Sequence, residues 1–352
     1  MTAHAAPSAA PASVRLETYR PVRTRLVWST VGFGLFAVLV CALAPLVGTT
    51  HIDLARALDR SIPFADNADA QILLVARLPR VLAGALVGAA LAAAGVVFQA
   101  LLRNPLATPF TLGVSAGASL GAMVVIIFGG AVSVGILSPV PLASLAGAFA
   151  ASAVVYLLAT SPGRAISTTV LLLAGVTLNA FISALILFVQ YLADFADVYR
   201  AARWLMGDLD VGGFDPIVAA LPLLAAAAIG MVFLPSSLNL LSISADTASA
   251  RGVDVARVQR GAFITGSLAT SAAVAVGGPI GFIGIIVPHL VRLMVGSDHR
   301  VLLPASALFG AAFLVGCDLL ARTVIAPVEI PVGVVTALLG GPFFLWLLVR
   351  KS

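Results

Sequence analysis

One uncharged segment constrains this chain more than any other feature. Residues Val81 to Leu102 form an apolar stretch of 22 residues without a charged side chain. At a rise of 1.5 Å per residue, a helix of this length crosses a hydrocarbon core of about 30 Å. The stretch holds small residues at Gly84, Gly88, Ala92 and Gly95. Because small residues let helices approach closely within a membrane, the segment predicts a transmembrane helix that packs against others.

The composition extends this prediction to the whole chain. Hydrophobic residues make up 61% of the 352 residues and charged residues 10%, whereas a soluble domain carries about 25% charged residues. We therefore predict an all-α polytopic membrane protein, in contact with membrane lipid, with about ten transmembrane helices. The candidate spans are residues 26–48, 79–102, 110–130, 138–160, 168–192, 214–235, 258–277, 280–295, 301–323 and 330–349.

Three segments lie outside these spans. Residues 1–25 are rich in alanine and proline and contain several arginines, which predicts a disordered cytoplasmic tail. Residues 49–76 are polar enough for a short surface helix. Residues 236–257 form a longer polar loop, in which Ser244, Asp246 and Thr247 suit a helix N-cap and Gly252 a stop. We expect two short helices joined at Gly252 there, the alternative being a connector without a role.

The distribution of charge predicts the orientation. If the N-terminus is cytoplasmic, 13 of the 20 lysines and arginines fall on the inner side, as the positive-inside rule requires. Both termini are then cytoplasmic. Because these cations are scattered over many short loops, the basic character of the chain does not indicate nucleic acid binding.

Some functions are excluded by missing residues. Lys351 is the only lysine and follows no glycine-rich loop, so the chain cannot be a P-loop ATPase or form a lysine Schiff base. No HExxH, CxxC or paired-carboxylate set is present, so we predict that the chain has no metal site and no catalytic residues. Cys41 and Cys317 both lie in apolar spans, and we expect them to be unpaired packing residues.

Nine ordered motifs after residue 70 point to a known family. They are R-LPR at 77–80, RNPLA at 103–107, LGVSAGA at 112–118, LLLAGV at 171–176, WLMG at 204–207, GPIGFIGIIVPHLVR at 278–292, DHRVLLP at 298–304, GCDLLAR at 316–322 and EIPVGVVTALLGGPFFLWLL at 329–348. Through them the chain resembles the permease subunit of type II ABC importers for iron-siderophore chelates, haem or vitamin B12.

The resemblance implies an architecture and a set of partners. It implies that residues 26–352 form a single transmembrane permease domain in the bacterial inner membrane. Its expected partners are a second copy of the chain, two P-loop ATPase subunits, and a periplasmic or lipoprotein substrate-binding protein. The chain is then no enzyme and has no cofactor of its own, because ATP and Mg²⁺ bind to the ATPase. The expected cargo is a ferric chelate of the siderophore type, with vitamin B12 (cobalamin) or haem as alternatives.

The resemblance also assigns arginines at the outer ends of spans. Arg77, Arg80 and Arg322 match positions that meet acidic side chains of the binding protein, and a guanidinium pairs well with carboxylates. The alternative is that they anchor helices at the membrane interface. Asp318 lies four residues before Arg322, so we expect an ion pair on one helix face rather than a proton relay.

Two further groups are expected at the inner side. The resemblance places a cytoplasmic gate at Asn104, Leu106, Thr168 and Thr169, where leucines can close a pore and small hydroxyls can pack and part. The alternatives are a turn residue for Asn104 and a helix cap for Thr168. It also places the contact with the ATPase at Asp246, Thr247, Ala248, Gly252 and Val253.

The match in this second group is imperfect. The family usually begins the segment with Gly-Glu-Glu and has a leucine before the glycine, whereas this chain has Ser244, Ala245 and Asp246, and Arg251 before Gly252.

Two functions of other classes remain for comparison. An ion-coupled secondary transporter usually buries ionisable residues near the membrane midplane, beside broken helices. An intramembrane enzyme needs a cluster of acid, base or metal-binding residues. The spans of this chain contain almost no carboxylates, which favours the importer. His289 is the histidine that lies clearly within a span, and we expect a structural role for it rather than haem ligation.

Overall fold

The computed structural model describes residues 22–129, 139–160 and 166–351, and the secondary structure within them is entirely helical. Residues 1–21 of the predicted tail and Arg164 lie outside the described residues. The longer helices are α1 (Val22–Leu43), α4 (Leu78–Leu102), α5 (Val114–Phe128), α6 (Pro139–Ala159), α7 (Thr168–Tyr191), α9 (Asp215–Val232), α12 (Val255–Gly277), α13 (Ile283–Val295), α14 (His299–Thr323) and α15 (Val332–Lys351). The shorter elements are η1 (Ala44–Leu46), α2 (Leu54–Ala57), η2 (Phe64–Asp66), α3 (Ala68–Gln71), the π-helix η3 (Ile72–Arg77), η4 (Pro109–Leu112), α8 (Phe195–Leu205), α10 (Pro235–Leu241) and α11 (Ala245–Ala250).

The ten longer helices of the described residues coincide with the ten predicted spans, which confirms the all-α polytopic fold. Six of them are long and apolar enough to cross a membrane, and α5, α13 and α15 contribute shorter apolar stretches.

Some boundaries differ from prediction. Helix α1 begins at Val22, so the last residues of the predicted tail are helical, and α5 begins at Val114 because η4 precedes it. Residues 49–76 fold into α2, η2, α3 and η3 rather than one surface helix.

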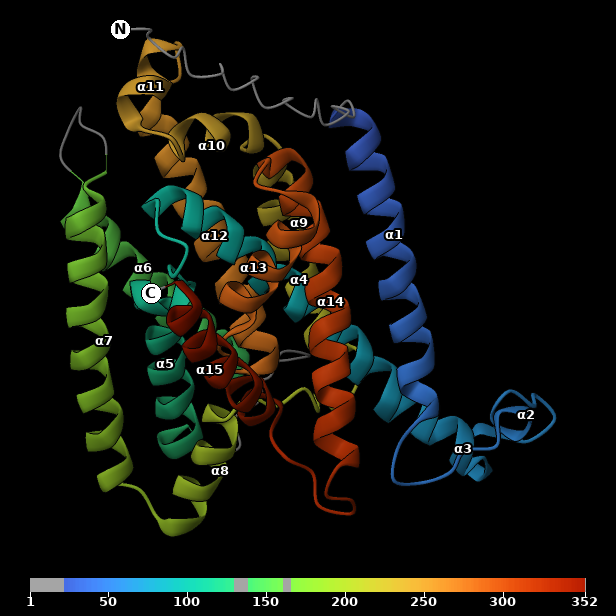
Figure 1. Ribbon diagram of the computed structural model, residues 1–352. Helices are drawn as coiled ribbons and strands as arrows, with labels where there is room; N and C mark the ends of the chain where they lie inside the picture. Colours follow the sequence, from blue (N-terminus) through green and yellow to red (C-terminus); the bar gives the residue numbers. More distant parts are fainter. Residues whose placement is uncertain (1–21, 130–138, 161–165, 352) are drawn as a thin grey trace, which may run out of the picture.

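Helix α4 lies at the centre of the bundle, where it contacts α12, α13 and α14 (Figure 1). Its small residues make these contacts possible. A Cβ atom added at Gly88 would overlap the carbonyl oxygen of Gly310 and lie 2.8 Å from the Cβ of Leu314 in α14. One added at Gly95 would lie 2.6 Å from the Cα of Gly284 in α13. The predicted close approach of helices along α4 is therefore confirmed.

The bundle has two distinct ends, which we name after the short helices there. Helices α10 and α11 lie at one end, together with the start of α1, and we call it the α11 end (Figure 1). Helices α8, α2 and α3 lie at the opposite end, which we call the α8 end. Helices α4 and α9 run towards the α11 end, and α14 runs from it.

The chain breaks between α12 and α13 in an unusual way. Gly278 and Phe282 both have positive φ angles, of 68° and 67°. Glycine adopts a positive φ angle readily, whereas in phenylalanine this conformation is sterically strained. The ring of Phe282 lies against Gly340 of α15, where an added Cβ would meet it.

Candidate functional site

Two of the predicted docking arginines are buried at the α8 end. Arg77 is 6% exposed, and its guanidinium donates hydrogen bonds to the carbonyl oxygens of Pro45, at 2.8 Å, and Thr50. Arg322 is 4% exposed and donates to the carbonyl oxygen of Ala44 at 2.8 Å. Both side chains therefore hold the segment after α1 against the bundle.

Arg80, the third predicted docking arginine, forms ion pairs with two carboxylates. Its Nε lies 2.9 Å from Asp318 Oδ1, and its Nη1 lies 2.7 Å from Glu329 Oε2. Asp318 also lies 3.3 Å from Arg322 Nε, so the predicted ion pair on one face of α14 is confirmed. We call these five residues, Arg77, Arg80, Asp318, Arg322 and Glu329, the arginine–carboxylate cluster.

The cluster leaves one charged group well exposed. The side chain of Glu329 is 48% exposed, and that of Arg80 only 12%. Glu329 is therefore the charged group of the cluster that lies at the surface, with Arg80 largely covered beside it. Arg77 and Arg322 are buried, so neither guanidinium presents its charge directly at the surface of the described residues.

The predicted gate residues lie on two separate elements at the α11 end. Asn104 Oδ1 accepts a hydrogen bond of 2.9 Å from the backbone N–H of Leu106, and the Asn104 carbonyl accepts one from Ala107. Asn104 is thus a turn residue, as the alternative predicted, and this bond presents Leu106, which is exposed, at the tip of the turn.

Thr168 and Thr169 begin α7, but neither is its cap. The side chain of Ser167 accepts the hydrogen bond from Val170 N–H, so the alternative assignment of Thr168 as the cap is wrong. Thr169 is exposed and Thr168 is half-buried. Both threonines therefore lie at the end of a helix that is largely exposed.

The predicted coupling segment forms the two short helices α10 and α11. Ser244, one of the three predicted candidates, is the N-cap of α11 and accepts a hydrogen bond of 2.9 Å from Thr247 N–H. The helices are joined at residues 242–244 and not at Gly252. Gly252, with φ of 79°, instead turns the chain from α11 into the long helix α12.

The exposed surface of this segment differs from the predicted set. Asp246 and Gly252 are exposed, and Thr247 and Val253 are half-buried. Ala248 is fully buried, so it lies beneath the surface rather than on it. Ile243, which was not predicted, is 69% exposed between the two helices. The sequence does not distinguish it from Leu240 and Leu241 just before it, of which Leu241 is buried.

A polar network that was not predicted ties this segment to α14. Asn239 of α10 donates to Asp298 Oδ1 at 2.7 Å and accepts from the backbone N–H of His299 at 2.8 Å. The pKa of Asp298 lies below its ordinary value because Arg300 and Asn239 donate side-chain hydrogen bonds to the carboxylate, which outweighs its burial. A displacement of α10 would therefore be transmitted to the first residues of α14 through these hydrogen bonds.

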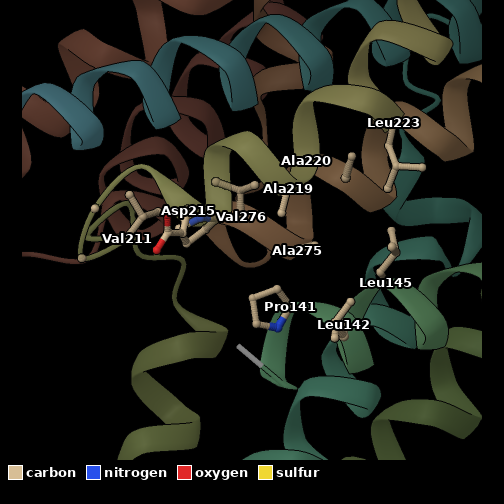
Figure 2. A pocket seen from close by; sticks show the side chains of 14 residues that line it. Pro141, Leu142, Leu145, Val211, Asp215, Ala219, Ala220, Leu223, Ala275 and Val276 are labelled. Atoms are coloured by element: carbon tan, nitrogen blue, oxygen red, sulfur yellow. The ribbon is translucent and has the colours of Figure 1, made fainter. Parts of the chain in front are cut away.

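Two of the cavities in the described part of the molecule lie away from these residues. Figure 2 shows one of about 260 Å³ near the α8 end, with Pro141 and Leu142 of α6 facing Ala219 and Ala275. A second, of about 460 Å³, lies beside the break between α12 and α13. Its walls are apolar and include Phe110, Met206, Phe282 and Leu338.

Comparison with known proteins decides the family. The model of the FecCD transport family matches residues 35–350, which is nearly the whole chain. The chain belongs to the FecCD transport family. FecCD permeases of several kinds are similar to it over most of their length.

Three of these similarities are informative. The chain is 42% identical to the cobalamin import system permease protein BtuC of Halobacterium salinarum, over 82% of this chain and 76% of that protein. It is 39% identical to the ferric enterobactin transport system permease protein FepD of Escherichia coli, over 91% and 95%. A solved inward-facing structure, assigned to the metal-chelate type of ABC transporter, superposes with a TM-score of 0.77 at 32% identity, covering 92% of this chain and 99% of that one.

Proposed function

We propose that this chain is the membrane-spanning permease subunit of an ATP-driven importer for a ferric chelate of the siderophore type. In this proposal two copies of the chain surround a central pathway in the bacterial inner membrane, with both termini in the cytoplasm. Two P-loop ATPase subunits bind at the α11 end, and a periplasmic or lipoprotein binding protein delivers the cargo at the α8 end. ATP hydrolysis in the partner shifts the equilibrium between outward- and inward-facing states.

The α10–α11 segment is the observation that carries the proposal. It presents an exposed apolar residue, Ile243, and an exposed carboxylate, Asp246, on a unit fixed to the membrane helices through Asn239 and Asp298. A surface of this kind suits a protein partner, since an apolar anchor rimmed by polar groups is typical of interfaces. The hydrogen-bond network then gives the partner a mechanical connection to α14.

We further propose that the arginine–carboxylate cluster is the docking site of the binding protein. Arg80 is the group that an incoming carboxylate reaches, and it exchanges Glu329 for that carboxylate. Arg77 and Arg322 contribute positive charge from beneath the surface rather than direct contacts. Such charges set the rate and register of docking more than the affinity.

The cluster also bears on the alternative of an ion-coupled secondary transporter. Asp318 is the buried carboxylate of α14, and both Arg80 and Arg322 pair with it. It lies five residues from the end of α14, about 8 Å along the axis, rather than near the midplane. A carboxylate so placed and so paired suits a structural role better than proton or sodium coupling.

For the cargo, the proposal rests on similarity and on the cavity walls. FepD and the metal-chelate transporter favour a ferric chelate, whereas BtuC favours cobalamin. The cavity beside Phe282 has an apolar wall suited to the hydrophobic rim of a bulky chelate. The same apolar wall would suit cobalamin or haem, so an uptake assay is needed to distinguish the three cargoes.

Co-purification tests the partners. With the chain tagged at the C-terminus and solubilised in mild detergent, we expect a P-loop ATPase to co-purify in stoichiometric amount. Ile243→Asp should remove it by placing a charge in the interface. Ile325→Asp changes another exposed isoleucine, at the α8 end, and should leave it bound. A homo-oligomer without ATPase, even after crosslinking at residues 244–253, would refute the proposal.

Uptake into proteoliposomes tests the cargo. The purified complex, its binding protein and internal ATP should together import a ferric siderophore. Cobalamin and hemin are offered in parallel. Uptake of either in place of the ferric chelate would correct the cargo and leave the importer intact. Uptake that needs no ATP and stops with a protonophore would instead establish a secondary transporter.

A further inference from the structure

A large apolar groove opens on the side of the bundle near the α11 end. Its volume is about 820 Å³, and it lies between α4, α9, α12 and α14. Leu86 and Ala93 of α4, Leu224 and Ala228 of α9, Ala269 of α12 and Leu303 of α14 form its walls. The groove is separate from the two cavities described above and shares no lining residue with them.

The polarity of the groove is confined to one end. Among the described residues that line it, Ser236 and Arg300 have the polar side chains, and both lie at the α11 end, where Leu26 of α1 also reaches it. The remaining lining residues are alanine, leucine, valine, methionine, phenylalanine and proline. The groove therefore has a polar mouth and an apolar interior.

This arrangement excludes water as the natural content of the interior. A buried water needs two to four polar partners, which alanine and leucine side chains do not supply. The surrounding medium of membrane helices is lipid, whose chains fill apolar space at no cost in hydrogen bonds. Along α9 the groove runs from Leu221 to Val232, about 16 Å at helical rise, which matches an acyl chain within one leaflet.

The mouth offers a contact for a phosphate group. Asp298 holds Arg300 in position, with distances of 3.0 Å to Nε and 2.7 Å to Nη2, and the Arg300 side chain is still 47% exposed. Guanidinium groups bind phosphate oxygens well, and basic pockets between membrane helices bind lipid head groups. Ser236 adds a hydroxyl at the same end.

We propose that this groove is a specific phospholipid site, with an acyl chain between α4, α9, α12 and α14 and the phosphate at Arg300 and Ser236. A bound lipid fills the space between the peripheral helix α9 and the central helices, so it belongs to the folded unit rather than to the exchanging lipid around it. The inference depends on the membrane fold alone and holds for any cargo.

Native mass spectrometry of the purified full-length chain tests the acyl-chain part. We expect a retained phospholipid on the wild-type protein after extensive washing in detergent. Ala228→Phe should abolish it by filling the groove. Ala226→Phe is the matched control, because Ala226 is exposed on the same helix but does not line the groove. Equal lipid retention in both variants, no retained lipid on the wild type, or a polypeptide in its place would overturn the proposal.

Arg300→Gln tests the contact with the phosphate head group, and its result does not depend on whether Ala228→Phe folds. Delipidated protein is offered phosphatidylglycerol or diacylglycerol, which has the same chains but no phosphate. We expect the wild type to prefer phosphatidylglycerol by about tenfold or more, as one strong charge-assisted contact would give, and Arg300→Gln to lose that preference while still binding both. An unchanged preference in Arg300→Gln, or none in the wild type, would refute the phosphate contact.

Discussion

Helices α4 and α7 are equally apolar, yet they occupy opposite positions in the molecule. The spans that contain them have the same mean hydropathy, but 78% of the α4 window is buried within the chain against 22% of the α7 window. In water such a difference would follow from hydrophobicity. In lipid, where a leucine gains little by leaving the solvent, it follows from how closely a helix surface can be packed.

The surfaces of the two helices show what decides the outcome. Helix α4 meets α14 and α13 through glycines at 88 and 95, and Arg80 at its start pairs with Asp318 of α14. Helix α7 has no charged residue and presents Leu173, Phe181 and Leu187 outward. Close glycine contacts and an ion pair along its length therefore distinguish α4, whereas α7 makes one such contact, at Gly175, and is otherwise faced outward by bulky apolar residues.

The largest expected effect comes from breaking the ion pairs of α4. Asp318→Asn removes the carboxylate that Arg80 and the buried Arg322 share, leaving Arg80 only Glu329, and we expect a loss of about 3–5 kcal/mol in the free energy of unfolding. Glu329→Gln is the control at the exposed edge of the same cluster, where we expect about 0–1 kcal/mol. Thermal unfolding in detergent measures both. Equal, small shifts would show that the buried pairs do not stabilise the bundle.

The same substitution in the two helices gives the most direct comparison. Leu91→Ala in α4 removes a fully buried side chain and should cost about 2–5 kcal/mol. Leu187→Ala in α7 removes an exposed one and should cost less than about 0.5 kcal/mol.

Chemical unfolding followed by circular dichroism measures this pair, and size-exclusion chromatography reports association. Dissociation of a dimer by Leu187→Ala, without unfolding, would assign α7 to the proposed interface between copies. A loss of folding stability in Leu187→Ala as large as in Leu91→Ala would contradict the distinction between inner and outer helices.

Enlarging a glycine tests the packing surface itself. Gly88→Leu places a side chain against the backbone of Gly310 and should destabilise the bundle by about 1–3 kcal/mol. Gly32→Leu in α1 meets nothing within 4 Å and should be tolerated. Melting temperatures of the two variants, compared at equal detergent concentration, decide the point. If Gly88→Leu melts like the wild type, close contact is not what holds α4 inside.

The smallest effect is expected outside the membrane helices. Ser244→Ala removes the side chain that caps α11, which should cost about 1 kcal/mol, confined to this short helix. Hydrogen exchange should then be faster at residues 245–250 and unchanged in α4. Ser244→Asp, which retains a capping acceptor, should restore the protection. Uniformly faster exchange would mean that α11 is part of the cooperative unit of the bundle.

The sequence predicted the elements well and their arrangement poorly. The fifth span, 168–192, is observed as residues 168–191, because a long apolar run with polar ends has only one way to cross a membrane. The break begins after Gly277 as predicted, but α13 begins at Ile283, three residues later than predicted, after Phe282, whose positive φ angle no propensity favours. Position in the bundle is not encoded in hydropathy, as α4 and α7 show.

Local contacts were likewise easier to predict than distant ones. The Asp318–Arg322 pair follows from a spacing of four residues on one helix and is confirmed. The pairing of Arg80 with Asp318 and Glu329 joins residues more than 200 positions apart, and Asn239 meets Asp298 across 59 positions. Such contacts depend on the packing of α4 and α10 against α14, which the sequence of one chain does not reveal.

The break between α12 and α13 has a consequence for how the chain enters the membrane. Helix α13 has 13 residues, about 20 Å, and is too short to cross the hydrocarbon core. Neither it nor α12 is among the six helices of the described residues that are long and apolar enough to cross. We therefore expect α13 to enter lipid together with a helix packed against it, such as α4 or α14, because its ends would otherwise expose backbone polar groups to the hydrocarbon core.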